Sequence, residues 1–144
     1  MQKPEYIDYS GKLNNHINYL NMLKLLDKKC NYIEIVLIDG KETNDLVNQF
    51  QSDILNISKV NSWWGNMTNG YNKKIKINYS NELFKYLKTK ETFCKFATLP
   101  EKGDVVNFTD FGLDDIAFFD ESTFPLLFTT THEGYIYVRD DILY

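Results

Sequence analysis

The clearest pattern along the chain is the run Tyr32–Ile38, in which β-branched and other apolar residues are interrupted only by Glu34. A short run of this kind, closed by Asp39-Gly40, is typical of a strand. Because it is nearly continuous rather than alternating, we expect it in the interior of a sheet, covered on both faces.

Apolar residues at three- and four-residue steps predict helices elsewhere. The first begins near Ser10, which could cap it, and buries a stripe that includes Ile17. The second opens at residues 43–44 and continues to Ile57. A third, shorter helix follows residues 80–81.

The remaining pattern predicts strands and turns. Asn69-Gly70 is a strong turn signal and indicates a hairpin between Trp63-Trp64 and residues 75–79. Gly112–Phe119 is expected to form a helical turn. The other expected strands are residues 92–99, 105–108, and a closing hairpin of residues 126–131 and 135–138.

This element order lacks the regular strand–helix alternation of a doubly wound fold. We therefore expect an α+β fold with a mostly antiparallel sheet and about three helices packed on one face. At 144 residues, 43% of them hydrophobic, the chain is long enough for one domain with a sizeable core, residues 1–144.

The N-terminal residues contain no apolar segment of a secretory signal, and no run approaches the roughly 18 residues of a membrane span. The sequence thus predicts a cytoplasmic protein without a membrane partner. Cys30 and Cys94 are expected to be reduced, buried thiols, because the chain does not resemble a disulfide-dense scaffold.

The distribution of charge along the chain is uneven. Residues 1–100 carry fourteen lysines against ten acidic residues, a net charge of +4. Residues 101–144 carry ten acidic residues against Lys102 and Arg139, a net charge of −8. Such an asymmetry concerns the choice of partner rather than the fold.

Motifs of catalysis are absent from the sequence. No glycine-rich phosphate loop occurs, and His16, His132, Cys30 and Cys94 show no metal-binding spacing, so we expect no cofactor, no metal and no catalytic residue. Two alternatives stay open. The carboxylates between Asp110 and Glu121 could hold a divalent cation for a metal-dependent hydrolase.

The second alternative is a single-strand nucleic-acid binding module. Lys73, Lys74 and Lys76 lie close in sequence to Trp63 and Trp64, and lysines mixed with aromatic residues can form a stacking platform. The acidic total, with a pI near 5.1, argues against a nucleic-acid partner.

The acidic C-terminal third favours a basic protein partner. Its acidic residues are interleaved with phenylalanines, which suggests aromatic anchors rimmed by carboxylates. An acidic surface of this kind could occupy the cleft with which a nuclease holds phosphates. The residues expected to contact the partner are Asp110, Phe111, Asp114, Asp115, Asp120, Glu121 and Trp64.

In size, acidity, lysine and asparagine content and the Asp/Phe-rich segment Phe108–Glu121, the chain resembles the immunity proteins of bacterial polymorphic-toxin systems, including those of contact-dependent growth inhibition. The resemblance implies a small cytosolic α+β protein that binds and blocks one cognate toxin domain, commonly a nuclease. It carries no motif from which individual site residues could be assigned.

Overall fold

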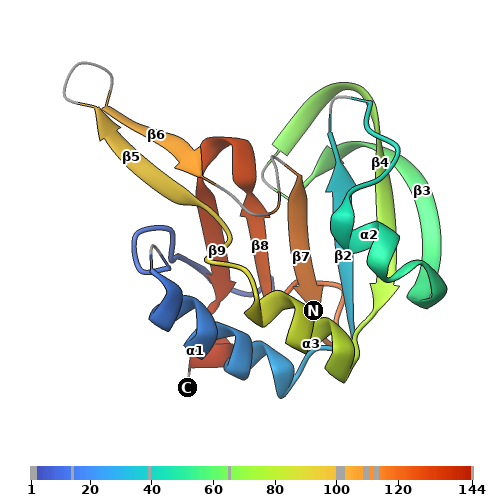
Figure 1. Cartoon of the computed structure of the whole chain (residues 1–144), viewed down its shortest axis with the longest axis horizontal. Helices are drawn as coiled ribbons and strands as arrows, with labels where there is room; N and C mark the ends of the chain where they lie inside the picture. Colours follow the sequence, from blue (N-terminus) through green and yellow to red (C-terminus); the bar gives the residue numbers. More distant parts are fainter. Residues whose placement is uncertain are drawn as a thin grey trace.

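The computed structural model describes residues 3–13, 15–38, 40–64, 66–99, 103–108, 111 and 114–143. Within these residues the chain forms three α-helices, a seven-stranded antiparallel sheet and a two-stranded hairpin (Figure 1). The α-helices are α1 (His16–Asp27), α2 (Asp45–Gln49) and α3 (Asn81–Lys88). Short 3-10 helices are η1 (Gln51–Asp53), η2 (Thr131–Glu133) and η3 (Asp140–Leu143).

The large sheet has the strand order β1-β9-β8-β7-β2-β4-β3, and each neighbouring pair is antiparallel. Its strands are β1 (Tyr6–Asp8), β2 (Tyr32–Leu37), β3 (Ile54–Trp63), β4 (Asn66–Asn78), β7 (Asp115–Phe119), β8 (Leu127–Thr130) and β9 (Tyr135–Arg139). The separate hairpin consists of β5 (Lys95–Leu99) and β6 (Gly103–Phe108). The α+β prediction, with one domain and a mostly antiparallel sheet, is therefore confirmed.

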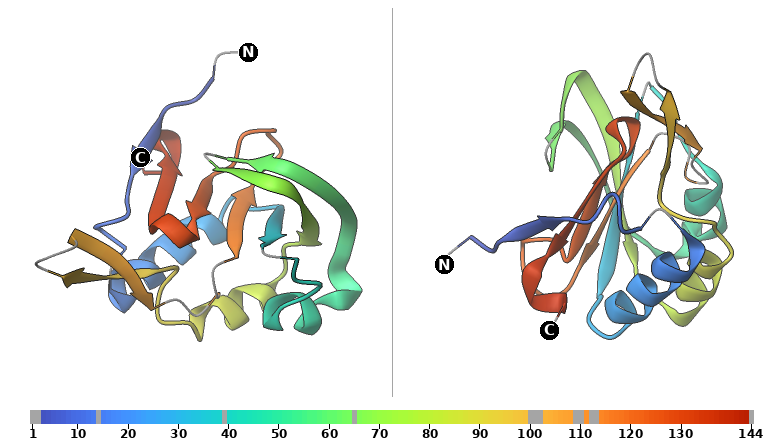
Figure 2. Two further views of the ribbon diagram at one scale, coloured as in Figure 1. Left: turned by 90° about the horizontal axis from the view of Figure 1, so that it is seen from above. Right: turned by 90° about the vertical axis from the view of Figure 1, so that its left-hand side faces the viewer.

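All three α-helices lie on one face of the large sheet (Figure 2). The main core fills the space between them, and it contains Tyr19 from α1, Leu87 from α3 and Phe118 from β7, all fully buried. The Tyr19 hydroxyl donates a 2.6 Å hydrogen bond to the Leu87 carbonyl, which ties α1 to α3 without an unsatisfied buried polar group.

Side-chain caps begin the helices. Asn15 accepts from the Asn18 N–H at 2.9 Å, Asn44 from the Val47 N–H at 2.9 Å, and Ser80 from the Leu83 N–H at 3.1 Å. The helix starts predicted at residues 43–44 and 80–81 are thus confirmed.

The cap predicted at Ser10 is wrong. This side chain is buried beside β1, where its hydroxyl donates to Asp8 at 2.6 Å and accepts from the Ile136 N–H at 2.8 Å. The helix begins later, and Ile17 is 73% exposed rather than part of the buried stripe.

The interior position of β2 and the closing β8–β9 hairpin are confirmed. The second helix is much shorter than predicted, because residues from Ile54 onward form β3 instead of helix. The turn predicted at Asn69-Gly70 is wrong, because both residues lie within β4 and the β3–β4 pairing already reaches Trp63 and Asn66. The expected helical turn over Gly112–Phe119 is the strand β7.

The face of the sheet opposite the α-helices is called the open face below. Seen from above, the β3–β4 hairpin curves round over this face, away from the helices (Figure 2). The curvature places the hairpin tip, with Trp63 and Trp64, above the middle of the sheet, and this arrangement creates the candidate site.

Candidate functional site

One row of residues crosses all seven strands on the open face. The paired positions in successive strands are Asp8, Tyr137, Phe128, Ala117, Glu34, Lys76 and Asn56. The solvated face of an antiparallel sheet usually carries mainly polar residues. Here aromatic residues occupy two consecutive strands of the row, so the open face has an apolar centre with charged residues on both sides.

A second, small hydrophobic core lies at this centre. Ala117, Phe119 and Phe128 are at most 7% exposed, although the α-helices pack on the other face. Trp64 covers them from the hairpin tip, with ring centroids 6.3 Å from Phe119 and 6.1 Å from Phe128. The curved hairpin therefore stabilises itself by burying aromatic surface on the open face.

The aromatic rings form a continuous line across the sheet, called the aromatic stripe below. Successive ring centroids are 6.1, 5.3, 6.1, 6.3 and 4.8 Å apart. In order, its members are Tyr135, Tyr137, Phe128, Trp64, Phe119 and Tyr32. These spacings lie within the range of favourable aromatic pairs, so the stripe is a pre-organised surface.

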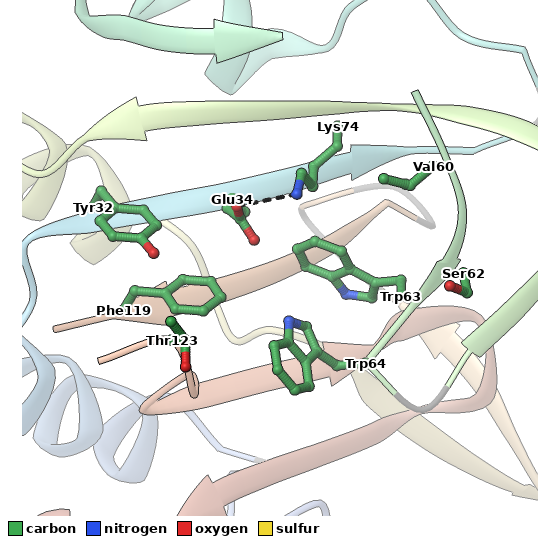
Figure 3. A pocket seen from close by; sticks show the side chains of 9 residues that line it. All are labelled: Tyr32, Glu34, Val60, Ser62, Trp63, Trp64, Lys74, Phe119 and Thr123. Atoms are coloured by element: carbon green, nitrogen blue, oxygen red, sulfur yellow. Dashed lines mark ion pairs between the residues drawn. The ribbon is translucent and has the colours of Figure 1, made fainter. Parts of the chain in front are cut away.

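One end of the stripe opens into a pocket of about 510 Å³ between the hairpin and the sheet (Figure 3). Its lining residues are Tyr32, Glu34, Val60, Ser62, Trp63, Trp64, Lys74, Phe119 and Thr123. Figure 3 shows Glu34 between the two pairs of rings and joined to Lys74, at 3.4 Å. The neighbouring Lys76 ammonium lies 4.1 Å from the Tyr32 ring centroid. Both lysines thus already have partners within the chain.

The other end of the stripe, on β1 and β9, is acidic. Tyr135 is 42% exposed, and Asp8 and Glu133 beside it are also exposed. Burial raises the pKa of Tyr137, and the negative charges of Asp8 and Glu133 raise it further. A tyrosine cluster bordered by carboxylates therefore faces solvent at this end, which is called the acidic end below.

Arg139 lies at the C-terminal end of β9, where it pairs with Tyr6 of β1. Its side chain is 8% exposed and donates to Asp120 at 2.7 Å, to Asp141 at 2.7 Å and to the Phe124 carbonyl at 3.0 Å. The positive charge of Arg139 is therefore paired within the chain.

Asp114 and Asp115 were expected on an exposed, partner-binding surface, and this expectation is wrong. Asp114 is 2% exposed and accepts from the Ile38 N–H at 3.2 Å, from the Asn44 amide at 3.0 Å and from Lys41 at 3.3 Å. Its carboxylate joins the end of β2 to the start of α2. It is buried because it satisfies polar groups that would otherwise have no partner.

Asp115 is 0% exposed and accepts from the Thr131 N–H at 2.8 Å, joining β7 to the turn after β8. Neither aspartate can touch a partner while the chain stays folded. The physical reason is the same for both, since buried carboxylates persist where several donors surround them.

The other predicted contact residues are dispersed. Phe111 stacks on Phe93 at 5.7 Å and belongs to the helix side of the sheet. Asp120 follows the far end of β7, and Glu121 beside it is exposed. Trp64 lies in the aromatic stripe, whereas Asp110 lies outside the described residues. The six of these residues that the structure describes therefore do not form one patch, and of the six only Trp64 and Asp120 adjoin the open face.

Sequence reasoning missed Tyr6, Asp8, Glu133, Tyr135 and Tyr137. A usable signal exists, because Tyr6-x-Asp8 and Tyr135-x-Tyr137 alternate at the strand period and so place their side chains on one face. The convergence of the two segments, more than 120 residues apart, follows only from the pairing of β1 with β9.

The described residues contain no group of three or more His, Cys, Asp or Glu side chains that could hold a metal ion. In this part of the chain, no arrangement of side chains supports the metal-dependent hydrolase alternative. Cys30 and Cys94 are free thiols, as expected, and burial raises their pKa values to about 12 and about 11. Such thiols stay protonated at neutral pH and are poor nucleophiles.

No family model, curated protein or solved structure matches the chain. A proposal for its function therefore rests on the geometry described above. Among the described helices, none has the length and apolar character needed to cross a membrane.

Proposed function

We propose that this chain is an immunity-type binding protein, which blocks a basic toxin domain by covering it with the acidic end and the adjoining aromatic stripe. The observation that carries the proposal is the exposed Tyr135 beside the half-buried Tyr137, a ring pair bordered by Asp8 and Glu133. The proposed contact surface replaces the acidic segment first expected to bind, because Asp114 and Asp115 of that segment are buried and serve the fold.

In this proposal the carboxylates and the tyrosine rings contribute to binding in different ways. Exposed carboxylates attract a basic partner and accelerate encounter, while tyrosines supply large, rigid contact area at a small entropy cost. A nuclease presents a positive cleft because it must hold phosphates. Carboxylates that enter this cleft would exclude the substrate without any covalent chemistry.

The test begins with the gene immediately upstream of this one. If it encodes a secreted protein with a basic C-terminal domain, that domain is titrated calorimetrically with the full chain, and an upstream gene of another kind counts against the proposal. Glu133→Lys should weaken binding by roughly tenfold to a hundredfold, as charge reversal at a complementary interface does. The matched control is Glu82→Lys, which changes an exposed acid on α3, on the helix side.

The outcomes are distinct. Loss of affinity in Glu133→Lys alone supports the acidic end as the contact surface. Equal affinities in both variants would place the contact elsewhere, and the absence of any binding by the upstream domain would overturn the proposal.

A second candidate is single-strand nucleic-acid binding, favoured by the position of Trp63 and Trp64 beside Lys74 in one pocket. Stacking platforms of this type need free cations along the strand. Because Lys74 is paired with Glu34 and Lys76 lies on Tyr32, we rank this function second. Fluorescence anisotropy of a labelled oligothymidylate at low salt tests it, and binding that Lys74→Ala abolishes would favour it over the protein partner.

A further inference from the structure

Among the described residues, no strand pairs with the outer edge of β3. β3 ends the sheet and hydrogen-bonds to β4 on its other side, and Figure 1 shows it as the outermost strand. A strand edge presents a row of backbone N–H and C=O groups. These groups specify the geometry of a partner, because only another extended strand can satisfy them.

This edge has only part of the usual protection against pairing: register irregularities between Ile54 and Asn56 and between Val60 and Ser62 leave residues 56–60 as a regular edge. Exposed edges normally carry several charges or a proline. Over its ten residues β3 has one charged residue, Lys59, and no proline. Leu55 is 56% and Ile57 50% exposed, so two of the four large apolar side chains exposed in the described part of the chain lie on this one strand.

We infer that β3 pairs with β3 of a second copy of this chain, antiparallel and centred on Ile57. The residues on either side of Ile57 are chemically alike, because Asn56 and Ser58 are both uncharged and polar. In the two-fold register Ile57 faces Ile57 of the other copy and Asn56 faces Ser58, within the regular part of the edge. Lys59 comes opposite Leu55, where the strand is irregular. Apolar meets apolar, and amide meets hydroxyl, as favourable cross-strand pairs require.

Charge is compatible with this register. The two Lys59 residues lie four positions apart along the paired strands, or about 14 Å, which exceeds the screening length of about 8 Å at physiological salt. Each lysine stem can lie over Leu55 of the other copy while its ammonium reaches solvent. The irregularities between Ile54 and Asn56 and between Val60 and Ser62 mark where regular pairing ends on either side.

The dimer has a consequence for the open face. Antiparallel pairing at the edge keeps the same face of both sheets on the same side, so the two sheets become one continuous sheet. The acidic ends lie at β1 and β9, the opposite edge from β3, and stay uncovered. The dimer would therefore present two acidic ends, and it stands or falls independently of the identity of the partner.

Sedimentation velocity from low micromolar to near-millimolar concentration tests the association. The unmodified chain should pass from monomer to dimer. Ile57→Lys should weaken dimerisation by at least roughly tenfold, because it places two ammonium groups directly opposite each other. Ile17→Lys is the matched control, since it changes an equally apolar residue, 73% exposed, on α1, and should dimerise like the unmodified chain.

A cross-link tests the register. Ile57→Cys should form a disulfide-linked dimer under mild oxidation, whereas Lys59→Cys should not, because its counterpart lies four positions away. Circular dichroism confirms that each variant is folded. A chain that stays monomeric at every concentration, or a dimer that Ile17→Lys breaks and Ile57→Lys leaves intact, would overturn the inference.

Discussion

The guanidinium of Arg139 donates a 2.7 Å hydrogen bond to the carboxylate of Asp120, joining the end of β9 to the residue after β7. The pair is mostly enclosed, since the two side chains are 8% and 24% exposed. Burial alone would raise the pKa of Asp120, but the hydrogen bonds from Arg139 and from the Ser122 N–H outweigh it and lower this pKa. The pair is thus a stabilising element beside the acidic end.

The first prediction concerns the free energy of unfolding. Asp120→Asn should reduce it by about 2 kcal/mol, because a charge-assisted hydrogen bond is lost and the enclosed guanidinium loses a partner. Urea unfolding measures the change. Asp141→Asn is the control on the same guanidinium, and it should cost under about 1 kcal/mol because Asp141 is 56% exposed. Equal costs in the two variants would contradict the assignment.

The second prediction is the pH dependence of this pair. A carboxylate whose pKa is lowered on folding contributes stability above its ordinary value of 3.8, and this contribution disappears as the pH falls through the lower, folded value. The difference in unfolding free energy between the unmodified chain and Asp120→Asn should therefore be constant from pH 7 to about pH 5 and shrink below about pH 4. A difference that grows in acid would reverse the sign and refute the pairing.

The third prediction separates structural from contact carboxylates in the segment first expected to bind a partner. Asp114→Ala should destabilise the chain by about 3 kcal/mol, because the Ile38 N–H and the Asn44 amide lose a buried acceptor. Glu121→Ala should change stability by less than about 0.5 kcal/mol, since Glu121 is exposed. Thermal melts of the two variants suffice. Similar melting temperatures would show that Asp114 is not an internal hub.

The sequence predicted strands best where one strong local pattern was present. The β-branched run of β2 and the Gly-containing turn of the β8–β9 hairpin are examples. The predicted length of the second helix was wrong for a specific reason. Ile54 and Ile57 both pair with core-facing residues of β4, although they lie three positions apart, because Leu55 is an extra residue at an irregularity of β3. A strand with such a bulge imitates helical spacing.

The candidate site was harder to predict, because its members are joined by long-range pairing. Asp114 takes its donors from residues 70 to 76 positions earlier, and nothing nearby in the sequence distinguishes it from the exposed Glu121. The sequence shows that this segment is acidic. Whether each carboxylate is buried or exposed depends on which strands become neighbours. The pairing of β1 with β9 was not encoded in any short motif.

The fourth prediction concerns the thiols. Burial raises the pKa of Cys30 to about 12 and that of Cys94 to about 11, so both should react slowly with a disulfide reagent at pH 8 in the folded chain. Both should react rapidly in urea, where the thiols regain ordinary pKa values. A fast phase of one thiol per chain under native conditions would contradict the burial of that cysteine.

The last prediction divides the aromatic stripe into a structural and a contact part. Trp64→Ala should lower the free energy of unfolding by about 3 kcal/mol, because it uncovers Phe119 and Phe128. It should also increase binding of a hydrophobic dye. Tyr135→Ala removes a ring that is 42% exposed and should cost less than about 1 kcal/mol, while it weakens binding of the basic partner domain. Calorimetry on both variants decides the point: if Trp64→Ala is as stable as Tyr135→Ala, the curved hairpin is not anchored by its indole, and the open face is free to rearrange around whatever it binds.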